Sequence, residues 1–209
     1  MRMFVALAPP EPAVADLAEF LAPRQEAGTG FRWTTPEQWH VTLAFLADVA
    51  DRRLDDLAER LARAARRRTR FGVSLRGGGA FPNAGRAKVL YAGADAGPAT
   101  EELRRLAVGA RAAAAKAGAP PEGSRFHPHV TLARLRAPID VTRWLRVLDA
   151  YQGPVWRADE IVLVESHLGE GPRRRPRYEL VDTFPLAVSA PEVNTAKPPD
   201  AMEAPEGFE

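Results

Sequence analysis

The chain has 209 residues, 45% of them hydrophobic and 27% charged, so it can bury the core of one domain or of two small lobes. It contains no cysteine, which excludes a disulfide framework, a thiolate metal site and a cysteine nucleophile. No apolar run reaches the roughly 20 residues of a membrane-spanning helix. Because Pro9-Pro10 also interrupts the N-terminal run before a signal-peptide core is complete, we expect a cytoplasmic protein that does not bind membranes.

Positive charge is concentrated in the body of the chain. The formal net charge is +2 at pH 7, but residues 190–209 hold five acidic residues against Lys197, so residues 1–189 have a net charge of +6. This excess suits a polyanion such as RNA, although a solvated arginine-rich surface explains it equally well. We expect residues 1–188 to form a single folded domain, and the acidic, proline-rich residues 189–209 to form a disordered tail.

Hydrophobic periodicity predicts strands and helices in alternation along the chain. In the first half we expect strand 2–8, helix 11–24, a turn at Pro36-Glu37, strand 39–46, helix 51–69, and strands 71–80 and 87–94 on either side of a turn. In the second half we expect a helix from Glu101 to Gly118, strand 128–134, a helix near 140–150, and strands 155–168 and 177–188.

The order of these elements nearly repeats. Strands 39–46 and 128–134 are each preceded by a helix and followed by a helix and two more strands. A repeated order of this kind predicts an α+β fold of two lobes with approximate internal two-fold symmetry. Strands that face each other from the two lobes would then line a cleft between them.

The expected helix 51–69 is rich in arginine, and two interpretations of it are open. Asp56–Arg60 and Glu59–Arg63 have the i,i+4 spacing of ion pairs on a helix surface. A solvated helix face therefore explains the charge, and contact with RNA is the alternative.

The strongest functional signal is a tetrapeptide that occurs twice, as His40-Val41-Thr42-Leu43 and His129-Val130-Thr131-Leu132. Side chains alternate between the faces of a strand, so the histidine and threonine of each copy share one face, and valine and leucine share the other. The apolar face can enter a core. Two such strands facing one cleft would provide the imidazoles and hydroxyls for acid–base chemistry on a small anion. A single histidine of this kind is more often structural, but the duplication favours a catalytic role.

At these residues the sequence resembles the 2H phosphoesterases, and within them the bacterial and archaeal RNA 2′,3′-cyclic phosphodiesterases, once called 2′-5′ RNA ligases. The resemblance covers about residues 2–187 and leaves the tail out. It rests on residues 2–7, 39–46, 126–134, 166–168 and 177–180.

The resemblance implies a bilobal fold of two antiparallel sheets with outer helices and a cleft between the lobes, and a reaction without metal or cofactor. It implies hydrolysis of a terminal RNA 2′,3′-cyclic phosphate to a 2′-phosphate, with RNA ends such as tRNA fragments, or cyclic nucleotides, as substrates. By motif position, His40 is the proton donor to the leaving 3′ oxygen and His129 is the proton acceptor that activates water. Thr42 and Thr131 are then ligands of phosphate oxygens. We expect the protein to be a monomer.

Arg134 is the best further candidate for a phosphate ligand, and the family often has a basic residue at this position. It follows Thr131 by three residues, so strict alternation would place it on the opposite face of the strand. A bend or bulge at the strand end would be needed to bring it to the cleft. A surface ion pair is the alternative role.

Three further features have less specific interpretations. His127 shares a face with His129 and could form a metal pair with it, but no carboxylate or cysteine cluster completes a site, which favours a structural role. His167 lies at a strand end, where a structural role is also favoured. The loop Arg173-Arg174-Arg175 with Tyr178 could bind RNA phosphates and stack on a base, or could be a solvated loop.

Other functions remain open from the sequence. The same scaffold and histidines would serve a 2′,5′-phosphodiesterase or a reversible 2′-5′ RNA ligase. A protein that binds RNA ends without catalysis could use the same cleft, although binding alone does not need two proton carriers. A metallohydrolase would be distinguished by its loss of activity with a chelator.

Overall fold

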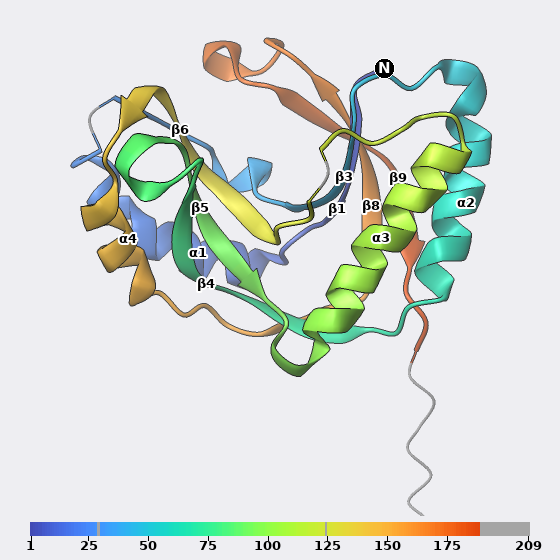
Figure 1. Ribbon diagram of the computed structural model, residues 1–209, viewed down its shortest axis with the longest axis horizontal. Coiled ribbons are helices and arrows are strands. Elements are labelled where there is room, and N and C mark those ends of the chain that lie inside the picture. The colour runs from blue at the N-terminus through green and yellow to red at the C-terminus, as the bar shows by residue number, and fades with distance from the viewer. Residues whose placement is uncertain (29, 124, 189–209) are drawn as a thin grey trace, which may run out of the picture.

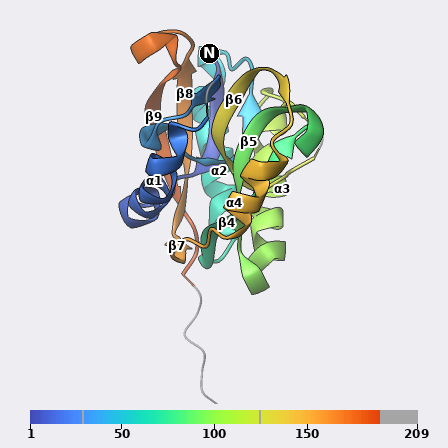
Figure 2. The same cartoon turned by 90° about the vertical axis from the view of Figure 1, so that its left-hand side faces the viewer.

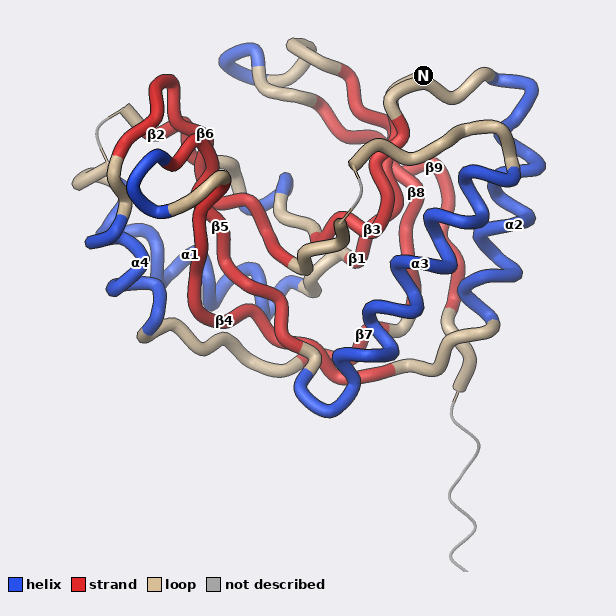
Figure 3. Tube along the Cα trace, in the orientation of Figure 1, coloured by secondary structure: helices blue, strands red, loops and turns tan. Residues whose placement is uncertain are grey.

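The computed structural model describes residues 1–28, 30–123 and 125–188, which form two antiparallel sheets with helices on their outer faces (Figures 1 and 3). One sheet has the strand order β3-β1-β8-β9 and the other the order β2-β6-β5-β4-β7. The strands are β1 Met3–Leu7, β2 Phe31–Trp33, β3 Val41–Leu46, β4 Phe71–Phe81, β5 Ala87–Asp95, β6 His129–Ile139, β7 Trp156–Ala158, β8 Glu160–His167 and β9 Arg177–Pro185. The predicted two-lobed α+β fold is confirmed, and the predicted disordered tail, residues 189–209, lies outside the described residues.

Two helices cover each sheet. The helices are α1 Glu11–Gln25, α2 Leu54–Arg66, α3 Thr100–Lys116 and α4 Thr142–Asp149. The pair α2 and α3 packs against the four-stranded sheet, while α1 and α4 lie against the five-stranded sheet on the other side of the molecule (Figures 1 and 2). The expected helix 51–69 is shorter in the structure, because Asp51–Arg53 forms a separate 3-10 turn and α2 ends at Arg66. No described helix is long and apolar enough to cross a membrane.

Each half of the chain contributes to both lobes. The four-stranded sheet joins β1 and β3 to the β8–β9 hairpin from the end of the chain, and the five-stranded sheet joins β6 to the β4–β5 hairpin from the first half. The helix before each tetrapeptide also packs on the opposite lobe, since α1 contacts β4 and α3 contacts β3. The approximate two-fold symmetry thus relates halves that exchange their hairpins, and neither lobe consists of one half alone.

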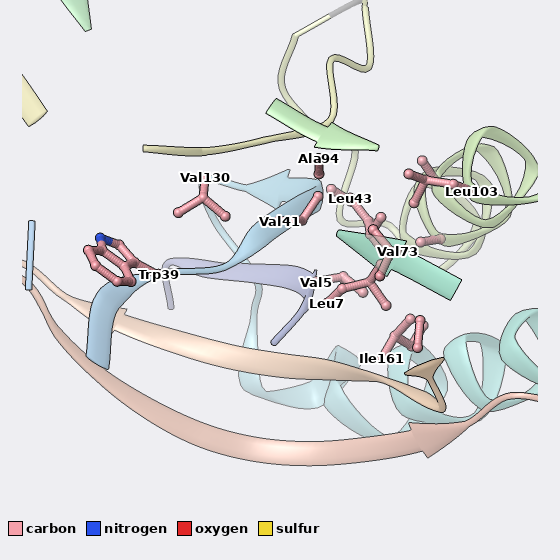
Figure 4. Packing of buried hydrophobic residues seen from close by; sticks show 14 of the residues in the cluster. Val5, Leu7, Trp39, Val41, Leu43, Val73, Ala94, Leu103, Val130 and Ile161 are labelled. Carbon is pink, nitrogen blue, oxygen red and sulfur yellow. The ribbon is translucent and has the colours of Figure 1, made fainter. Parts of the chain in front are cut away.

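A single large apolar cluster joins the two lobes. Figure 4 shows Val41 and Leu43 of β3 in this cluster together with Val5 of β1, Val73 of β4 and Val130 of β6, all at most 2% exposed. Burial of a Val or Leu side chain stabilises a fold by about 1.5–3 kcal/mol. The apolar side chains of both tetrapeptides therefore fix the direction of their polar side chains, which must point away from the core.

The expected strand 155–168 is wrong, because the chain changes sheets within it. β7 pairs with β4 in one sheet and β8 pairs with β1 in the other. The change occurs at Asp159, whose carboxylate pairs with Arg70 and Arg157 and whose carbonyl accepts a hydrogen bond from the Leu186 N–H. An apolar run predicts a strand but does not specify its partners, so the sequence could not indicate this break. It also gave no signal for the three-residue strand β2.

Candidate active site

The first tetrapeptide contains a β-bulge directly after its threonine. In the pairing of β3 with β1, Thr42 lies opposite Ala6 and Ala44 lies opposite Val5, so Leu43 is an extra residue. Leu43 and Ala44 are consequently buried one after the other, at 2% and 1% exposure. A bulge of this kind shifts the alternation of side chains by one position along the strand.

The second tetrapeptide contains the same bulge at the same position. In the pairing of β6 with β5, Thr131 lies opposite Tyr91 and Ala133 lies opposite Leu90, which makes Leu132 the extra residue. Leu132 and Ala133 are both fully buried. The repeated sequence therefore produces a repeated backbone irregularity, in addition to a repeated pair of polar side chains.

The two bulges decide which side chain follows each threonine on the cleft face. Phe45 in β3 and Arg134 in β6 both line the cleft, three residues after Thr42 and Thr131. The face problem predicted for Arg134 is resolved by the bulge at Leu132, which returns Arg134 to the side of Thr131. Arg134 makes no ion pair within the described part of the chain, so the surface ion pair considered for it is not formed there.

Both tetrapeptide histidines are oriented by a backbone carbonyl two residues earlier. The Nδ1 atom of His40 lies 2.7 Å from the carbonyl oxygen of Gln38, and the Nδ1 atom of His129 lies 2.6 Å from that of His127. A carbonyl oxygen can only accept, so Nδ1 carries the hydrogen in both rings. In each neutral imidazole the nitrogen without a hydrogen is therefore Nε2, whose lone pair can accept a proton.

Aromatic rings surround both histidines. The His40 ring stacks on Phe4, with centroids 4.2 Å apart, and meets the edge of Tyr178 at 5.5 Å. The His129 ring contacts Phe81 at 5.1 Å and Tyr91 at 5.0 Å. These contacts restrict the rotation of each imidazole and remove water from its faces.

The pKa values of both histidines are lowered. The pKa of His40 is lowered from 6.5 to about 4, mainly by burial and to a smaller extent by the charges of His129 and Arg134, while its hydrogen bond to the Gln38 carbonyl opposes the shift. Burial is also the main cause that lowers the pKa of His129, followed by the charges of His127 and Arg134. Both imidazoles are consequently neutral at pH 7 in the free protein.

The histidines lie in one cleft between the sheets, with a volume of about 670 Å³. This volume is within the usual range for a small-molecule site. All five residues predicted for the site line this cleft, namely His40, Thr42, His129, Thr131 and Arg134. The structure adds further lining residues: Arg2, Phe4, Arg32, Trp33, Thr34, Gln38, Phe45, Ser166, Leu168, Gly169, Arg174, Arg175, Pro176 and Tyr178.

The charge of the cleft is entirely positive. Among the described residues, its lining contains five arginines and no aspartate or glutamate. Within the described residues, none of these five side chains forms a hydrogen bond or an ion pair, whereas Arg60 and Arg63 of α2 pair with Asp56 and Glu59 as predicted. The arginines of the cleft thus have no carboxylate within ion-pair distance in the described residues, although the charge of Arg175 is one of the smaller causes that lower the pKa of Glu37. Arg60 and Arg63 of α2, by contrast, are each paired with a carboxylate.

Several of these residues had only a weak signal in the sequence. Arg2 and Phe4 alternate along the predicted first strand, which would have placed them on one face, but nothing showed that this face lines the cleft. Arg32 lies beside Arg134 only because β2 pairs with β6, where the two residues are opposite each other. Seven further lining residues come from the β8–β9 hairpin, whose pairing with β1 is a tertiary property: Ser166, Leu168, Gly169, Arg174, Arg175, Pro176 and Tyr178.

The other two histidines lie outside this arrangement. His127 is exposed, and its ring lies 5.9 Å from that of His129. In the described residues there is no group of three or more potential metal-ligating side chains. His167 lies among Glu165, Glu170 and Glu179 and does not line the cleft, in keeping with the structural role expected for it.

Comparison with known proteins places this geometry in a family. Residues 7–91 and 95–173 match the family model described as LigT like Phosphoesterase. The chain is 34% identical over 158 residues to the RNA 2′,3′-cyclic phosphodiesterase of Aeropyrum pernix, which covers 73% of this chain and 87% of that protein. It is 33% identical over 192 residues to the protein of the same name from Thermus thermophilus, covering 89% and 90%.

Solved structures agree with this assignment. A crystal structure of a protein from Thermus thermophilus, 32% identical, superposes with a TM-score of 0.74 over 91% of this chain and 100% of that chain. Apo LigT of E. coli, 25% identical, superposes with a TM-score of 0.69 over 89% and 97%. Both tetrapeptides lie within the residues that the family model matches. The shared sequence and the shared two-sheet architecture therefore place this chain among the LigT-like phosphoesterases of the 2H phosphoesterase group.

Proposed function

We propose that this protein hydrolyses the 2′,3′-cyclic phosphate at the end of an RNA strand to a 2′-phosphate. The observation that carries the proposal is the pair of histidines in one cleft, each with Nδ1 bonded to a carbonyl, where the described lining residues include five arginines and no carboxylate. The names of the relatives from Aeropyrum pernix and Thermus thermophilus support the same reaction. A terminal cyclic phosphate is a strained monoanion, which suits a small positive cleft.

The reaction needs one base and one acid. His129 takes a proton from water at its Nε2, and the water oxygen forms a bond to phosphorus. The bond from phosphorus to the 3′ oxygen breaks, and protonated His40 gives its Nε2 proton to that oxygen. In-line displacement places the entering and leaving oxygens on opposite sides of phosphorus, so acid and base on strands from opposite lobes fit this geometry.

The phosphate oxygens need hydrogen-bond donors other than the two histidines, which act as acid and base. Thr42 and Thr131 stand two residues after the histidines, on the same face of each motif, and line the same cleft. In the described part of the chain neither hydroxyl makes a hydrogen bond, so both can donate to a ligand. Arg134 adds a full positive charge, which stabilises the oxygens as negative charge increases on them.

Substrate binding changes the protonation of the two histidines toward the state that the reaction needs. In the free protein the lowered pKa values leave both histidines neutral at pH 7, whereas the reaction needs His40 protonated and His129 neutral. A phosphate anion in the cleft favours the charged form of a neighbouring imidazole and so raises its pKa. We therefore infer that the substrate's own charge helps to create the protonated acid.

The decisive test is to identify the product formed from a nucleoside 2′,3′-cyclic monophosphate. We expect a 2′-phosphate, formed equally well in excess EDTA. Formation of a 3′-phosphate would show that the 2′ oxygen, and not the 3′ oxygen, is the leaving group. Failure to turn over both the nucleotide and an RNA with a cyclic end would contradict the proposed reaction and favour a protein that binds RNA ends without catalysis. Loss of activity in EDTA that added zinc or manganese restores would favour a metallohydrolase.

A further inference from the structure

The β8–β9 hairpin extends the cleft beyond the two histidines. Its connecting loop, residues 168–176, projects from the end of the four-stranded sheet, in orange at the top of Figure 1. Arg174 and Arg175 in this loop line the same cleft as His40 and His129. These two side chains therefore add positive charges that the reaction at the cyclic phosphate, as proposed above, does not use.

The hairpin has two faces with different chemistry. On one face Ser166 and Tyr178 are paired across the strands and line the cleft. On the other face His167 lies 3.3 Å from Glu179, and Arg177 forms ion pairs with Glu179 at 2.9 Å and with Glu170 at 3.0 Å. Arg177 is thus paired with two carboxylates, and these contacts hold the base of the loop together.

The arginines of the loop contrast with Arg177 at its base. Arg177 has two carboxylate partners, whereas Arg174 and Arg175 form no ion pair with any described residue. Arg174 also has a φ of 57°, a left-handed conformation that is unusual for a residue with a side chain. Such a conformation persists where the surrounding structure fixes it, and it is found frequently at binding sites.

The loop is tied directly to the first histidine. The side-chain amide of Gln38 donates a hydrogen bond to the Pro176 carbonyl at 3.0 Å, and the carbonyl of Gln38 accepts the hydrogen bond from His40 Nδ1. The Gly171 N–H donates to the Arg175 carbonyl at 2.8 Å, which closes the loop on itself. Arg174 and Arg175 are therefore held at a fixed place relative to the proposed proton donor.

We propose that Arg174 and Arg175 bind the phosphates of the RNA strand on the 5′ side of its cyclic end. The cleft then prefers an oligoribonucleotide over a cyclic mononucleotide, because only the former has phosphates beyond the terminal one. This inference rests on the proposed function, since it assumes that the cyclic end lies between the two histidines. Single-stranded RNA is commonly bound in this way, by a positive groove that follows the backbone.

The test compares two substrates in the full-length protein. One is a nucleoside 2′,3′-cyclic monophosphate, and the other is an oligoribonucleotide of about eight nucleotides with a 2′,3′-cyclic end, a length typical of single-strand sites. In the double variant Arg174→Ala/Arg175→Ala, we expect kcat/KM for the oligoribonucleotide to fall by about tenfold or more relative to kcat/KM for the mononucleotide. The slope of log KM for the oligoribonucleotide against the logarithm of the salt concentration should decrease by about 0.7 for each phosphate that the variant no longer binds.

Two further variants separate specific contacts from general charge. Arg174→Lys/Arg175→Lys keeps the charge and should retain most of the preference for the longer substrate. Arg66→Ala/Arg67→Ala removes two exposed arginines at the end of α2, outside the cleft, and should keep the wild-type ratio. An equal fall on both substrates, no fall on either, or a similar change in the α2 variant would overturn the proposal.

A binding measurement keeps this inference separate from the proposed reaction. If the wild-type protein turns over neither substrate, the proposed function fails, but the loop can still be tested with a labelled oligoribonucleotide that ends in a 3′-phosphate. Fluorescence anisotropy should then show about tenfold weaker binding by Arg174→Ala/Arg175→Ala than by the wild type. Equal binding by both proteins would overturn the role of the loop.

Discussion

His40 and His129 belong to identical tetrapeptides, yet their surroundings differ. His40 lies flat on Phe4, and its pKa falls to about 4. His129 has no stacked partner among the described residues and has exposed His127 close by, whose charge is one of the causes that lower its pKa. Identical sequence therefore does not give identical chemistry, and the assignment of acid and base must be tested on the molecule.

The leaving group of the substrate distinguishes the two roles. If His40 is the acid, His40→Ala should lose roughly 10²-fold or more in kcat on a cyclic phosphate, but much less on a nitrophenyl phosphodiester, whose leaving group needs little protonation. His129→Ala lacks the base that activates water and should lose about equally on both. The opposite pattern would mean that the two roles are reversed, and thermal unfolding of each variant controls for loss of fold.

Removal of a phosphate-oxygen donor should have a milder effect than removal of a histidine. Thr42→Val and Thr131→Val keep the shape and remove one neutral hydrogen-bond donor each, so we expect kcat/KM to fall by roughly tenfold. Arg134→Ala removes a charged donor and should cost more than either. Wild-type kcat/KM in both threonine variants would assign Thr42 and Thr131 a structural role.

The pH dependence should differ between the free protein and the substrate complex. The profile of kcat/KM reports the free protein, where burial lowers the pKa of His40 to about 4 and also lowers that of His129. Since the acid must be protonated, activity is lost as the pH rises through its pKa. Bound phosphate raises both pKa values, so the bell-shaped profile of kcat should have its maximum at higher pH than that of kcat/KM. Coincident maxima would show that the substrate does not shift these groups.

Among the elements, the bulges and the β8–β9 hairpin position the site. Leu43 and Leu132 interrupt β3 and β6 at the same place, and this common irregularity brings Phe45 and Arg134 to the cleft face. The hairpin then closes one side of the cleft through the hydrogen bond from Gln38 to its loop. An irregular position in a strand and a loop contact thus determine more of the site than the regular parts of either sheet.

Loss of the Gln38 side chain should loosen this loop. Gln38→Ala removes the hydrogen bond to the Pro176 carbonyl, together with the bond that Gln38 Oε1 accepts from the Thr35 N–H. The bond to the loop contributes about 0.5–1.5 kcal/mol, or about two- to tenfold in a local opening equilibrium. We therefore expect trypsin to cleave after Arg174 about two- to tenfold faster than in the wild type. The carbonyl that orients His40 belongs to the backbone and is retained, so a large fall in kcat with unchanged cleavage would contradict this account.

The whole molecule combines a positive cleft with an acidic C-terminal segment. Residues 190–209 have a net charge of −4 and follow β9, whose last described neighbours hydrogen-bond to the backbone at Arg68 and Arg70. The folded part keeps all of the proposed catalytic residues, and its apolar cluster joins both lobes. We therefore propose residues 1–188 as one domain and expect the tail to influence RNA binding through charge alone.

Deletion of residues 190–209 should leave the fold and the turnover of a cyclic mononucleotide unchanged. Because it removes four net negative charges, it should also lower KM for an RNA substrate at low salt, and this gain should disappear at high salt. Thermal unfolding and KM at two salt concentrations check both expectations. A truncated protein that unfolds at a clearly lower temperature would show that the tail packs against the domain.

Local sequence was enough to predict the helices, most strands and the pair of histidine motifs. The hydrophobic periodicity of a segment and the alternation of side chains between strand faces are local properties. They predicted that Val41 and Val130 enter a core and that His40 and His129 point away from it, as they do. The repeated order of elements also predicted two lobes. These inferences needed only neighbouring residues, and the fold and the lining of the cleft agree with them.

The exchange of hairpins between the halves, and the choice of arginines that face the cleft, arise only in the folded chain. The pairing of β8 with β1, the break at Asp159 and the pairing of β2 with β6 that brings Arg32 beside Arg134 depend on contacts between residues far apart in the chain. Arginine is paired with carboxylates in α2, at Arg60 and Arg63, whereas the described residues that line the cleft include arginines and no acid. Its role follows from the charges that folding brings beside it, and these charges cannot be read from local sequence.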